Sequence, residues 1–364
     1  MDKKKIIFFI GEIGLGGSER QMSLILNHLD KKQYEYYIIV FNSSPYGDLK
    51  EELNQTGVQL YFVPQNNSSI LERLYYLYKL IKPLKPEVIY SWTIHNNAYA
   101  GVIGKILKVP ITIGSVRGSL FGTGFLNLPR ILKWASLNIV SLLAVNSNEL
   151  RNQLIRMKIS KEKIRFIPNC VTKINLQETI MKKNEFIICT IGNLRRNKNH
   201  KFFIDVIEKV QEKVPKVKGW IIGQPVSDEP NLKKELENYI KSKGLQNAVN
   251  LLGFQHNIVK YLKESSIFVM TSLSEGTPNS ILEAMSFGIP VVSTSVGGVP
   301  DIINSGNNGF LFEPTNKDGF VNIIINLLND KNFRIKIGNS GKKYVEDCHC
   351  PSLGKGIIEE MFQV

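Results

Sequence analysis

Short apolar segments alternate with longer amphipathic stretches from one end of the chain to the other. This alternation predicts strands and helices in turn, which is typical of parallel α/β sheets. The first half has predicted helices over 17–29 and 96–107 and strands near 6–10, 37–41, 60–63, 88–90, 111–114 and 141–145. The second half has predicted strands over 185–192, 219–222, 249–251, 267–270 and 291–294, and a last helix over about 354–362.

The chain has 364 residues, which is long for one ordinary core, so we expect two domains. A loop at Phe166-Ile-Pro-Asn-Cys-Val171 separates the two alternations, which gives an N-terminal domain over 1–170 and a C-terminal domain over 171–351. The apolar run at 6–10 is too short for a signal peptide, and the longer run at 137–145 falls short of the roughly 18 residues that span a membrane. We therefore expect a cytoplasmic protein.

Positive charge is concentrated in the first half. Residues 1–170 carry 22 Lys and Arg against 12 Asp and Glu, whereas residues 171–364 carry 24 against 20. A basic half suits nucleic acid, an anionic membrane or an acidic ligand, or it provides solubility alone. Because no nucleic-acid-binding motif is present, we expect no nucleic-acid partner. The segment Cys348-His-Cys350 lacks a second ligand pair at zinc spacing, so no metal site is predicted there.

The most informative segment is Glu275-Gly-Thr-Pro-Asn-Ser-Ile-Leu-Glu283, which a predicted strand follows. Thr277 is a natural N-cap, Pro278 suits the first helical position, and Gly288 suits the left-handed residue that ends a helix. The helix therefore begins over 279–281.

Backbone N–H groups at the start of that helix, those of Asn279, Ser280 and Ile281, form an anion site. Glu275 precedes the helix and Glu283 lies inside it. One carboxylate can therefore lie beyond a bound anion and the other behind it. A sugar–diphosphate–ribose ligand has the same order of parts.

This string resembles the E-x7-E motif of retaining GT-B glycosyltransferases of family 4, the group 1 glycosyltransferases. The resemblance implies two Rossmann-like domains with parallel sheets facing a central cleft, and residues from about 352 to 364 crossing back to the first domain. It implies that Glu275 faces the donor sugar and that Glu283 binds the ribose hydroxyls. The diphosphate would meet the intervening amides, those of Gly276, Thr277 and the helix start.

The first strand leads into Gly11-Glu-Ile-Gly-Leu-Gly-Gly17-Ser-Glu-Arg20. A dinucleotide fingerprint would need Gly or Ala where Glu19 stands, and no Walker Gly-Lys-Ser/Thr follows. The loop resembles the Gly-Gly-x-Glu-Arg loop of the family. That resemblance implies that Gly16 and Gly17 border the diphosphate and the acceptor.

The segment from Ile191 to His200 resembles the phosphate-binding loop of the family. Lys198 falls on the family lysine that neutralises the donor phosphates, but Asn193 replaces the family arginine. We expect Arg195 or Arg196 to supply the missing cation. Farther along, Leu-Leu-Gly-Phe254 matches the loop whose backbone meets the nucleobase, which favours UDP without determining it.

The chain contains no Asp-x-Asp, the carboxylate pair through which many glycosyltransferases hold a metal on the donor diphosphate. Lys198, a nearby arginine and the helix-start amides must then stabilise the leaving diphosphate. We therefore expect an enzyme that needs neither a metal nor another cofactor.

In the first half, His95 and Arg117 follow two predicted strands, at the edge where open α/β sheets bind ligands. They resemble a branch of polysaccharide-building enzymes with Trp-x-x-His and then Arg at these places. We place both near the acceptor or the reacting centre, where Arg117 supplies a permanent positive charge. A purely structural role for His95 stays open. The glycine-rich loop over 117–124, with Phe121 and Phe125 in or beside it, is expected to close over the acceptor or a lipid.

The resulting hypothesis is a retaining, metal-independent enzyme that moves a hexosyl group from a UDP-sugar or another nucleotide diphosphate sugar. Its acceptor would be a hydroxyl of a glycan or lipid-linked molecule in the biosynthesis of capsule, O-antigen or a similar surface polysaccharide. The basic first domain favours peripheral contact with an anionic membrane. Two alternatives stay open: a GT-B nucleotide-sugar epimerase and a non-catalytic nucleotide-sugar-binding subunit.

Overall fold

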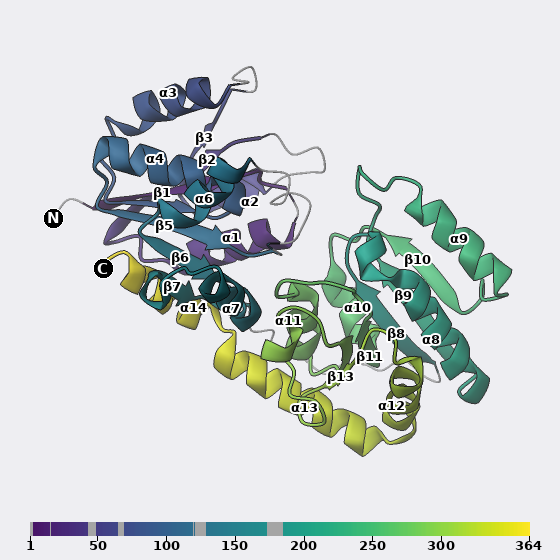
Figure 1. Ribbon diagram of the computed structural model, residues 1–364. Helices are drawn as coiled ribbons and strands as arrows, with labels where there is room; N and C mark the ends of the chain where they lie inside the picture. The colour runs from purple at the N-terminus through teal and green to yellow at the C-terminus, as the bar shows by residue number, and fades with distance from the viewer. Residues whose placement is uncertain are drawn as a thin grey trace. The chain divides into compact units, whose positions relative to one another are not determined.

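The computed structural model describes residues 3–14, 16–42, 49–64, 69–118, 120, 129–172 and 185–364. The chain divides into two compact units (Figure 1). Unit 1 comprises residues 1–170 and 351–364, and unit 2 comprises residues 171–350. The glycine-rich loop over 117–124 that we expect to close over the acceptor lies, with Phe121 and Phe125, mostly outside the described residues. Only Arg117, Gly118 and Leu120 of it are described.

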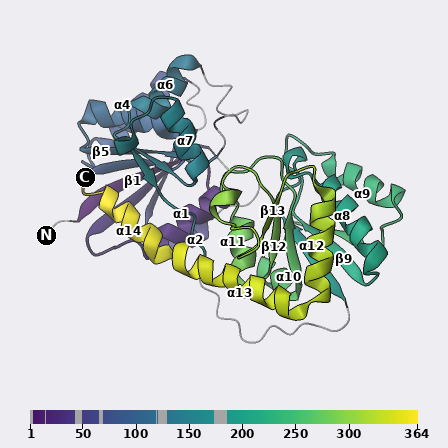
Figure 2. The same cartoon turned by 60° about the horizontal axis from the view of Figure 1, so that its bottom comes forward.

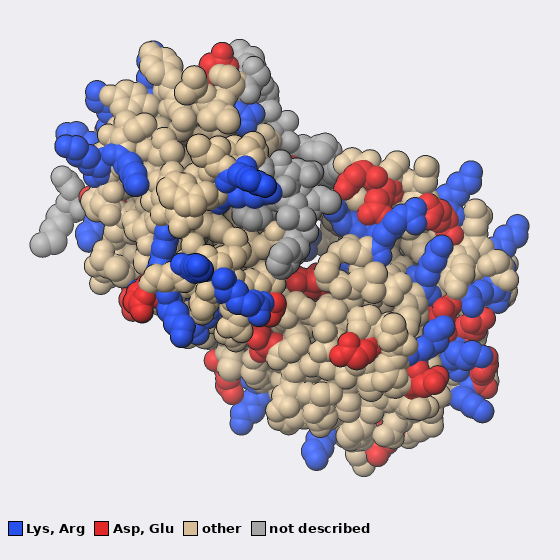
Figure 3. Space-filling view, viewed as in Figure 1, with Lys and Arg blue, Asp and Glu red and all other residues tan. Residues whose placement is uncertain are grey.

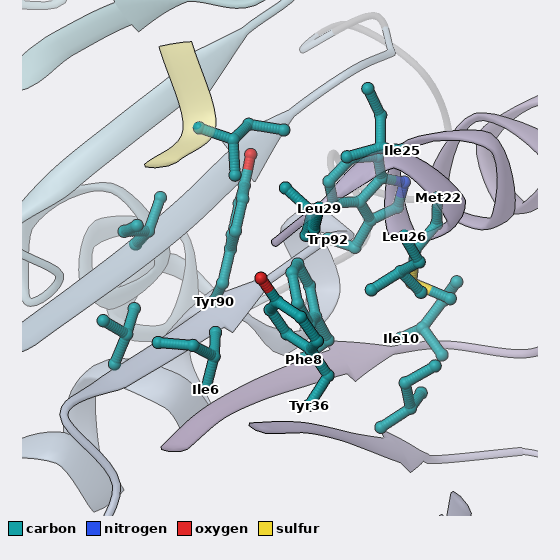
Figure 4. Close-up of a cluster of buried hydrophobic side chains, with 14 of the residues drawn as sticks. Ile6, Phe8, Ile10, Met22, Ile25, Leu26, Leu29, Tyr36, Tyr90 and Trp92 are labelled. Atoms are coloured by element: carbon teal, nitrogen blue, oxygen red, sulfur yellow. The ribbon is translucent and has the colours of Figure 1, made fainter. Parts of the chain in front are cut away.

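Unit 1 is built on a parallel sheet of seven strands in the order β3-β2-β1-β4-β5-β6-β7. The strands of unit 1 are β1 (Lys4–Ile10), β2 (Tyr34–Val40), β3 (Gln59–Phe62), β4 (Val88–Ser91), β5 (Ile111–Val116), β6 (Leu142–Val145) and β7 (Ile164–Phe166). Strand β1 is central and apolar throughout its buried part because both faces of the sheet are covered. Phe8 packs on one face with α1 residues such as Leu26 (Figure 4). Phe9 packs on the other face with Leu77 and Ile103.

The helices of unit 1 are α1 (Gly17–His28), α2 (Lys50–Gln55), α3 (Ile70–Ile81), α4 (Asn97–Leu107), α6 (Arg130–Asn138), α7 (Asn148–Arg156) and α14 (Pro351–Met361), with 3-10 turns η1 (Ile94–Asn96) and η2 (Lys161–Lys163). The C-terminal helix α14 joins the core of unit 1 through Ile358 and Met361, and the ribbon runs beside α1 (Figure 2). A Cβ atom on Gly354 would lie 2.7 Å from Cys170 Sγ, so a glycine permits this close packing. The predicted return of the last helix to the first domain is confirmed.

Unit 2 has a parallel sheet of six strands in the order β10-β9-β8-β11-β12-β13. Its strands are β8 (Phe186–Ile191), β9 (Val217–Ile222), β10 (Val249–Gly253), β11 (Ile267–Met270), β12 (Val291–Thr294) and β13 (Phe310–Phe312). Its helices are α8 (His200–Lys213), α9 (Leu232–Ser242), α10 (Ile258–Glu264), α11 (Asn279–Ser286), α12 (Lys317–Asn329) and α13 (Lys331–Cys348), with η3 (Arg196–Lys198) and η4 (Val299–Asp301). Two separate hydrophobic clusters cover the two faces of the sheet.

The predicted strands are confirmed, and the alternation missed only β7 and β13 of those described. Each of the two has three residues and lies at the edge of its sheet. Such strands are too short to show a period and are only partly buried. In the part of the chain that the structure describes, every helix is too short or too polar to cross a membrane.

Candidate functional site

Three neighbouring strands of unit 2, β8, β11 and β12, end at the same edge of the sheet, so the loops that follow them meet. Leu273 N–H donates to the carbonyl oxygen of Asn197 at 2.7 Å, and Thr271 Oγ1 donates to that of Lys198 at 3.0 Å. These bonds hold the loop after β8 against the loop after β11. The sheet order therefore brings together two segments that are more than 70 residues apart.

The two loops place Lys198 and Glu275 in direct contact. Lys198 Nζ lies 2.5 Å from Glu275 Oε1, and Ser272 Oγ donates to the same oxygen at 2.5 Å. The two charged side chains are 23% and 11% exposed, so their interaction is only partly screened by solvent. The sequence motifs predicted Lys198 and Glu275 as site residues. Ser272 belongs to no recognisable motif, so the sequence alone did not identify it.

A glycine pair supports the loop that carries Glu275. Gly297 has a φ of +55°, and a Cβ atom at this position would overlap the backbone oxygen of Glu275. Gly298 N–H donates to the carbonyl oxygen of Gly276 at 2.8 Å. This segment therefore shapes the loop of Glu275 by backbone contact.

Helix α11 begins at Asn279, as predicted, but its cap is one residue later than expected. Pro278 occupies the N-cap position with φ −74° and ψ 117°, which is extended backbone, so the expectation of Thr277 as N-cap and Pro278 as the first helical residue is wrong. The first turn contains no acidic residue, which leaves the positive end of the helix dipole uncompensated within it. Gly288 ends the helix with a φ of +69°, as expected.

Within α11, Ile281 is fully buried, and Ser280 and Glu283 are half-buried. Glu283 is one turn from Asn279 and therefore lies on the same side of the helix. The carboxylates of Glu275 and Glu283 thus stand before and within the helix start, in the order that the sequence predicted.

The loops after β9 and β10 meet the loop after β8. Gly223 N–H donates to the carbonyl oxygen of Gly253 at 2.9 Å, and a side chain on Gly223 would overlap the backbone oxygen of Gly192. Gly253 has a φ of +68°, which turns the chain toward Phe254. The half-buried ring of Phe254 packs edge-on against His256 at 4.8 Å.

Arg195 and Arg196 form ion pairs with acidic residues of the segment after β9 and of α9. Arg195 Nη1 lies 3.7 Å from Asp228, and Arg196 Nη2 lies 2.7 Å from Glu235. Their side chains are 45% and 65% exposed. Lys198 is the cation placed against Glu275, and the substitution of either arginine for the family arginine stays a prediction.

Unit 1 has a polar group at its own sheet edge, built around Arg117. The guanidinium carbon lies 3.7 Å from the ring centre of Trp92, and Nη1 donates to Asn169 Oδ1 at 3.4 Å. Trp92 is fully buried and donates its indole N–H to the carbonyl oxygen of Ser18. Trp92 therefore connects Arg117 to the start of α1, where Gly16 and Gly17 lie.

His95 lies in η1, after the end of β4. Part of its ring is exposed, and burial of the remainder lowers the pKa of the imidazole below its usual 6.5. His95 is therefore mainly neutral at pH 7 and able to accept a proton. Sequence reasoning named His95 and Arg117 but gave no role to Asn169, which is distant along the chain.

Comparison with known proteins finds a matching family model for each of the two units. The model of the family described as Glycosyl transferases group 1 matches residues 172–344, and that of Glycosyltransferase Family 4 matches residues 15–173. An uncharacterized glycosyltransferase of Methanocaldococcus jannaschii is 30% identical over 298 residues, which are 74% of this chain and 71% of the relative. The chain belongs to the group 1 glycosyltransferases.

Two further relatives extend this result. The Escherichia coli UDP-Gal:alpha-D-GlcNAc-diphosphoundecaprenol alpha-1,3-galactosyltransferase is 26% identical over 355 residues, 91% of this glycosyltransferase and 89% of the relative. The crystal structure of HepE from Anabaena, in complex with UDP, aligns with this chain at a TM-score of 0.86 and 20% identity. The alignment covers 99% of this chain and 99% of the HepE chain. The likeness to HepE, together with the two parallel sheets, shows that the enzyme has the GT-B fold.

The first turn of α1, which follows the glycine loop, contains a carboxyl group with a shifted pKa, that of Glu19. Burial raises the pKa of Glu19 from 4.5 to about 7; the group's own backbone N–H opposes this effect, and nearby Glu12 adds to it. Between pH 4.5 and 7 the folded protein holds a proton that the unfolded chain has released. The free energy of unfolding therefore falls as pH rises through this window, by about 3 kcal/mol at most.

We expect Glu19→Gln to remove this dependence, because the amide keeps the shape of the carboxyl group and does not titrate. Urea unfolding of both proteins at pH 5 and pH 8 measures it. The variant should gain most of its stability relative to the parent at pH 8 and much less at pH 5. Equal pH slopes in the two proteins would show that Glu19 does not titrate in this window.

Substitution of Arg117 tests the unit 1 site. Arg117→Lys keeps the charge but loses the planar contact with Trp92, worth about 0.5–2 kcal/mol. We expect transfer to an acceptor to fall about 10-fold, while hydrolysis of the donor alone stays near the parent rate. Parallel assays of transfer and donor hydrolysis separate the two steps. Parent-like transfer by Arg117→Lys would mean that charge alone suffices.

Proposed function

We propose that this glycosyltransferase transfers a hexosyl group from a UDP-sugar to a hydroxyl of a lipid-linked or glycan acceptor, with retention and without a metal, in the assembly of a surface polysaccharide. The observation that carries the proposal is the contact of Lys198 with Glu275 directly before the positive end of α11. The UDP in the HepE structure and the diphosphoundecaprenol acceptor named for the Escherichia coli relative support the donor and acceptor classes.

In this proposal the bond from the sugar C1 to the diphosphate oxygen breaks, and its electron pair goes to the diphosphate. Lys198 and the α11 amides stabilise that charge. Glu275 positions the sugar and stabilises the positive charge that develops on it. The acceptor hydroxyl forms the new bond on the same face and gives its proton to a phosphate oxygen of the donor. Neither step requires a metal, in agreement with the missing Asp-x-Asp.

A panel of UDP-sugars, each incubated with the enzyme in EDTA and then with added Mn²⁺, tests this proposal. We expect slow donor hydrolysis that EDTA leaves intact, and an initial NMR product with the anomeric configuration of the donor. An inverted product would contradict retention, and activity only with Mn²⁺ would contradict metal independence. The comparisons give no support to the epimerase and the binding subunit, which would show epimer formation or binding without turnover in the same assay.

Glu283 offers a separate test of donor binding. Because its proposed contact with the ribose is the same before and during the reaction, Glu283→Ala should raise the KM for the donor about 10-fold or more and leave kcat nearly unchanged. Initial rates over a range of donor concentrations measure both. A fall in kcat at unchanged KM would place Glu283 in the reacting centre instead.

A further inference from the structure

The connection from β12 to β13 and helix α13 of unit 2 form the walls of an open cavity of about 560 Å³. The loop wall comprises residues 300–308, and the helix wall is the part of α13 from Ser340 to Asp347. Pockets that bind small molecules have volumes of about 300–1,000 Å³, so this cavity is large enough for a ligand. None of its lining residues belongs to the donor site or to the polar group around Arg117.

Hydrogen bonds within the protein hold the loop wall in shape. Asn308 is buried; its Oδ1 accepts from the backbone N–H of Asn304 at 2.7 Å, and its Nδ2 donates to the carbonyl oxygen of Ile302 at 3.0 Å. Tyr344 of the helix wall donates its hydroxyl to the carbonyl oxygen of Asp301 at 2.8 Å, which joins the two walls. The cavity is therefore formed without a ligand.

Polar side chains from both walls line the cavity. Within the described ranges of the chain, five of them make no hydrogen bond or ion pair with another protein group. Amide and hydroxyl groups both donate and accept hydrogen bonds, and a carboxylate accepts them. A ligand in the cavity can thus pair with groups that the fold itself does not use. The five side chains are those of Asn304, Asn307, Ser340, Lys343 and Asp347.

The charge of the lining argues against an anionic ligand. Among the described lining residues, Asp301 and Asp347 stand against a single cation, Lys343, so the lining repels a phosphate or a nucleotide. On the face drawn in Figure 3, the charged side chains of unit 2 gather over α8 and α9, whereas the area over β13 and the middle of α13 is mostly tan. These observations favour a neutral, polar ligand.

The composition of the lining suits a sugar. Pro300 and Tyr344 add apolar surface to the unpaired polar groups. A pyranose has the matching character, because its ring carbons are apolar while each of its hydroxyl groups donates and accepts a hydrogen bond. The Asp347 carboxylate can accept from such a hydroxyl, and the amides of Asn304 and Asn307 can both accept and donate.

We propose that this cavity is a carbohydrate-binding site of unit 2 for neutral sugar residues, separate from the donor site. The inference goes beyond the proposed function, since neither donor binding nor transfer uses the cavity. A free sugar and a residue within a glycan chain offer the same chemistry to the lining. The two sources differ in whether a second, linked sugar residue adds to the affinity.

Saturation-transfer difference NMR on the full chain, in EDTA and without a donor, tests the inference. The probes are the methyl glycosides of glucose, galactose and N-acetylglucosamine, and the disaccharides maltose, lactose and diacetylchitobiose. We expect saturation transfer to at least one probe, and titration then gives its Kd. A disaccharide that binds about 10-fold tighter than the methyl glycoside indicates a glycan chain, and equal affinity indicates a free sugar.

Two variants and a matched control identify the cavity. Asn304→Ala/Asn307→Ala removes two unpaired amides, and Ser340→Tyr fills the cavity from the helix wall. Each should raise the Kd of the bound probe about 10-fold or more. Asn322→Ala/Asn326→Ala changes two exposed asparagines of α12 that are not part of the lining, so this variant should bind like the parent. Parent-like melting temperatures show that all three variants fold.

The donor site needs its own control, because it also accommodates a sugar in the proposed function. Glu275→Gln should bind the probes like the parent. The inference is overturned if no probe shows saturation transfer, if both cavity variants bind like the parent, or if only Glu275→Gln loses binding. Donor hydrolysis without sugar binding at the cavity defeats this inference alone. Sugar binding at the cavity without donor hydrolysis defeats the proposed function alone.

Discussion

Lys198→Ala is expected to lower the kcat of transfer by about 10²–10³-fold, the usual cost of removing one group that stabilises charge in the transition state. Lys198 is the cation that contacts Glu275, at 2.5 Å and 23% exposure, so its charge acts with little screening. In the proposed site, its loss leaves the diphosphate with the helix amides and whichever arginine assists them. It also leaves Glu275 with Ser272 as its remaining contact at Oε1.

The measurement is the steady-state rate of transfer and of donor hydrolysis, with the melting temperature as a check on folding. Lys201→Ala is a matched control, because Lys201 is exposed in the first turn of the following helix and close in sequence. Arg195→Ala and Arg196→Ala, measured in parallel, show which arginine assists the lysine. Full activity of Lys198→Ala in both assays would make the assignment of the donor site wrong.

Gly297→Ala is expected to lower kcat/KM by about 100-fold through a residue that touches no substrate. An added Cβ atom would overlap the backbone oxygen of Glu275, so the loop must move, and a displacement of about 1 Å at a reacting group has an effect of that size. The φ of +55° adds a cost of about 1–2 kcal/mol for a residue other than glycine.

Gly306→Ala separates the two effects. Gly306 has a φ of +84°, but no atom lies within 4 Å of the position of its Cβ. We expect Gly306→Ala to lose similar stability from backbone strain and to keep its activity. Urea unfolding and initial rates for both variants decide the matter. Equal loss of activity in the two variants would show that strain, and not contact with Glu275, is responsible.

Most of the order of strands and helices was predictable because most strands here are runs of buried apolar residues, and each such run is visible locally. The start of α11 at Asn279 was predictable for the same reason, since helix signals lie within a few residues. The predicted N-cap is wrong by one residue. Proline is favoured at the first helical position, but Pro278 has an extended ψ of 117° and therefore occupies the N-cap itself. Three-residue edge strands such as β13 carry too little pattern.

The sequence by itself determined the two α/β units and the helix with Glu275 before it and Glu283 inside it, and it predicted Lys198 as a donor-site cation. All of these depend on residues that are close along the chain. Only the tertiary structure decided that Lys198 contacts Glu275, that Gly297 supports that loop, and that Trp92 stacks on Arg117. These contacts join segments that follow different parallel strands, and such strands are separated by long crossover connections. No local pattern records which loops then meet at the sheet edge.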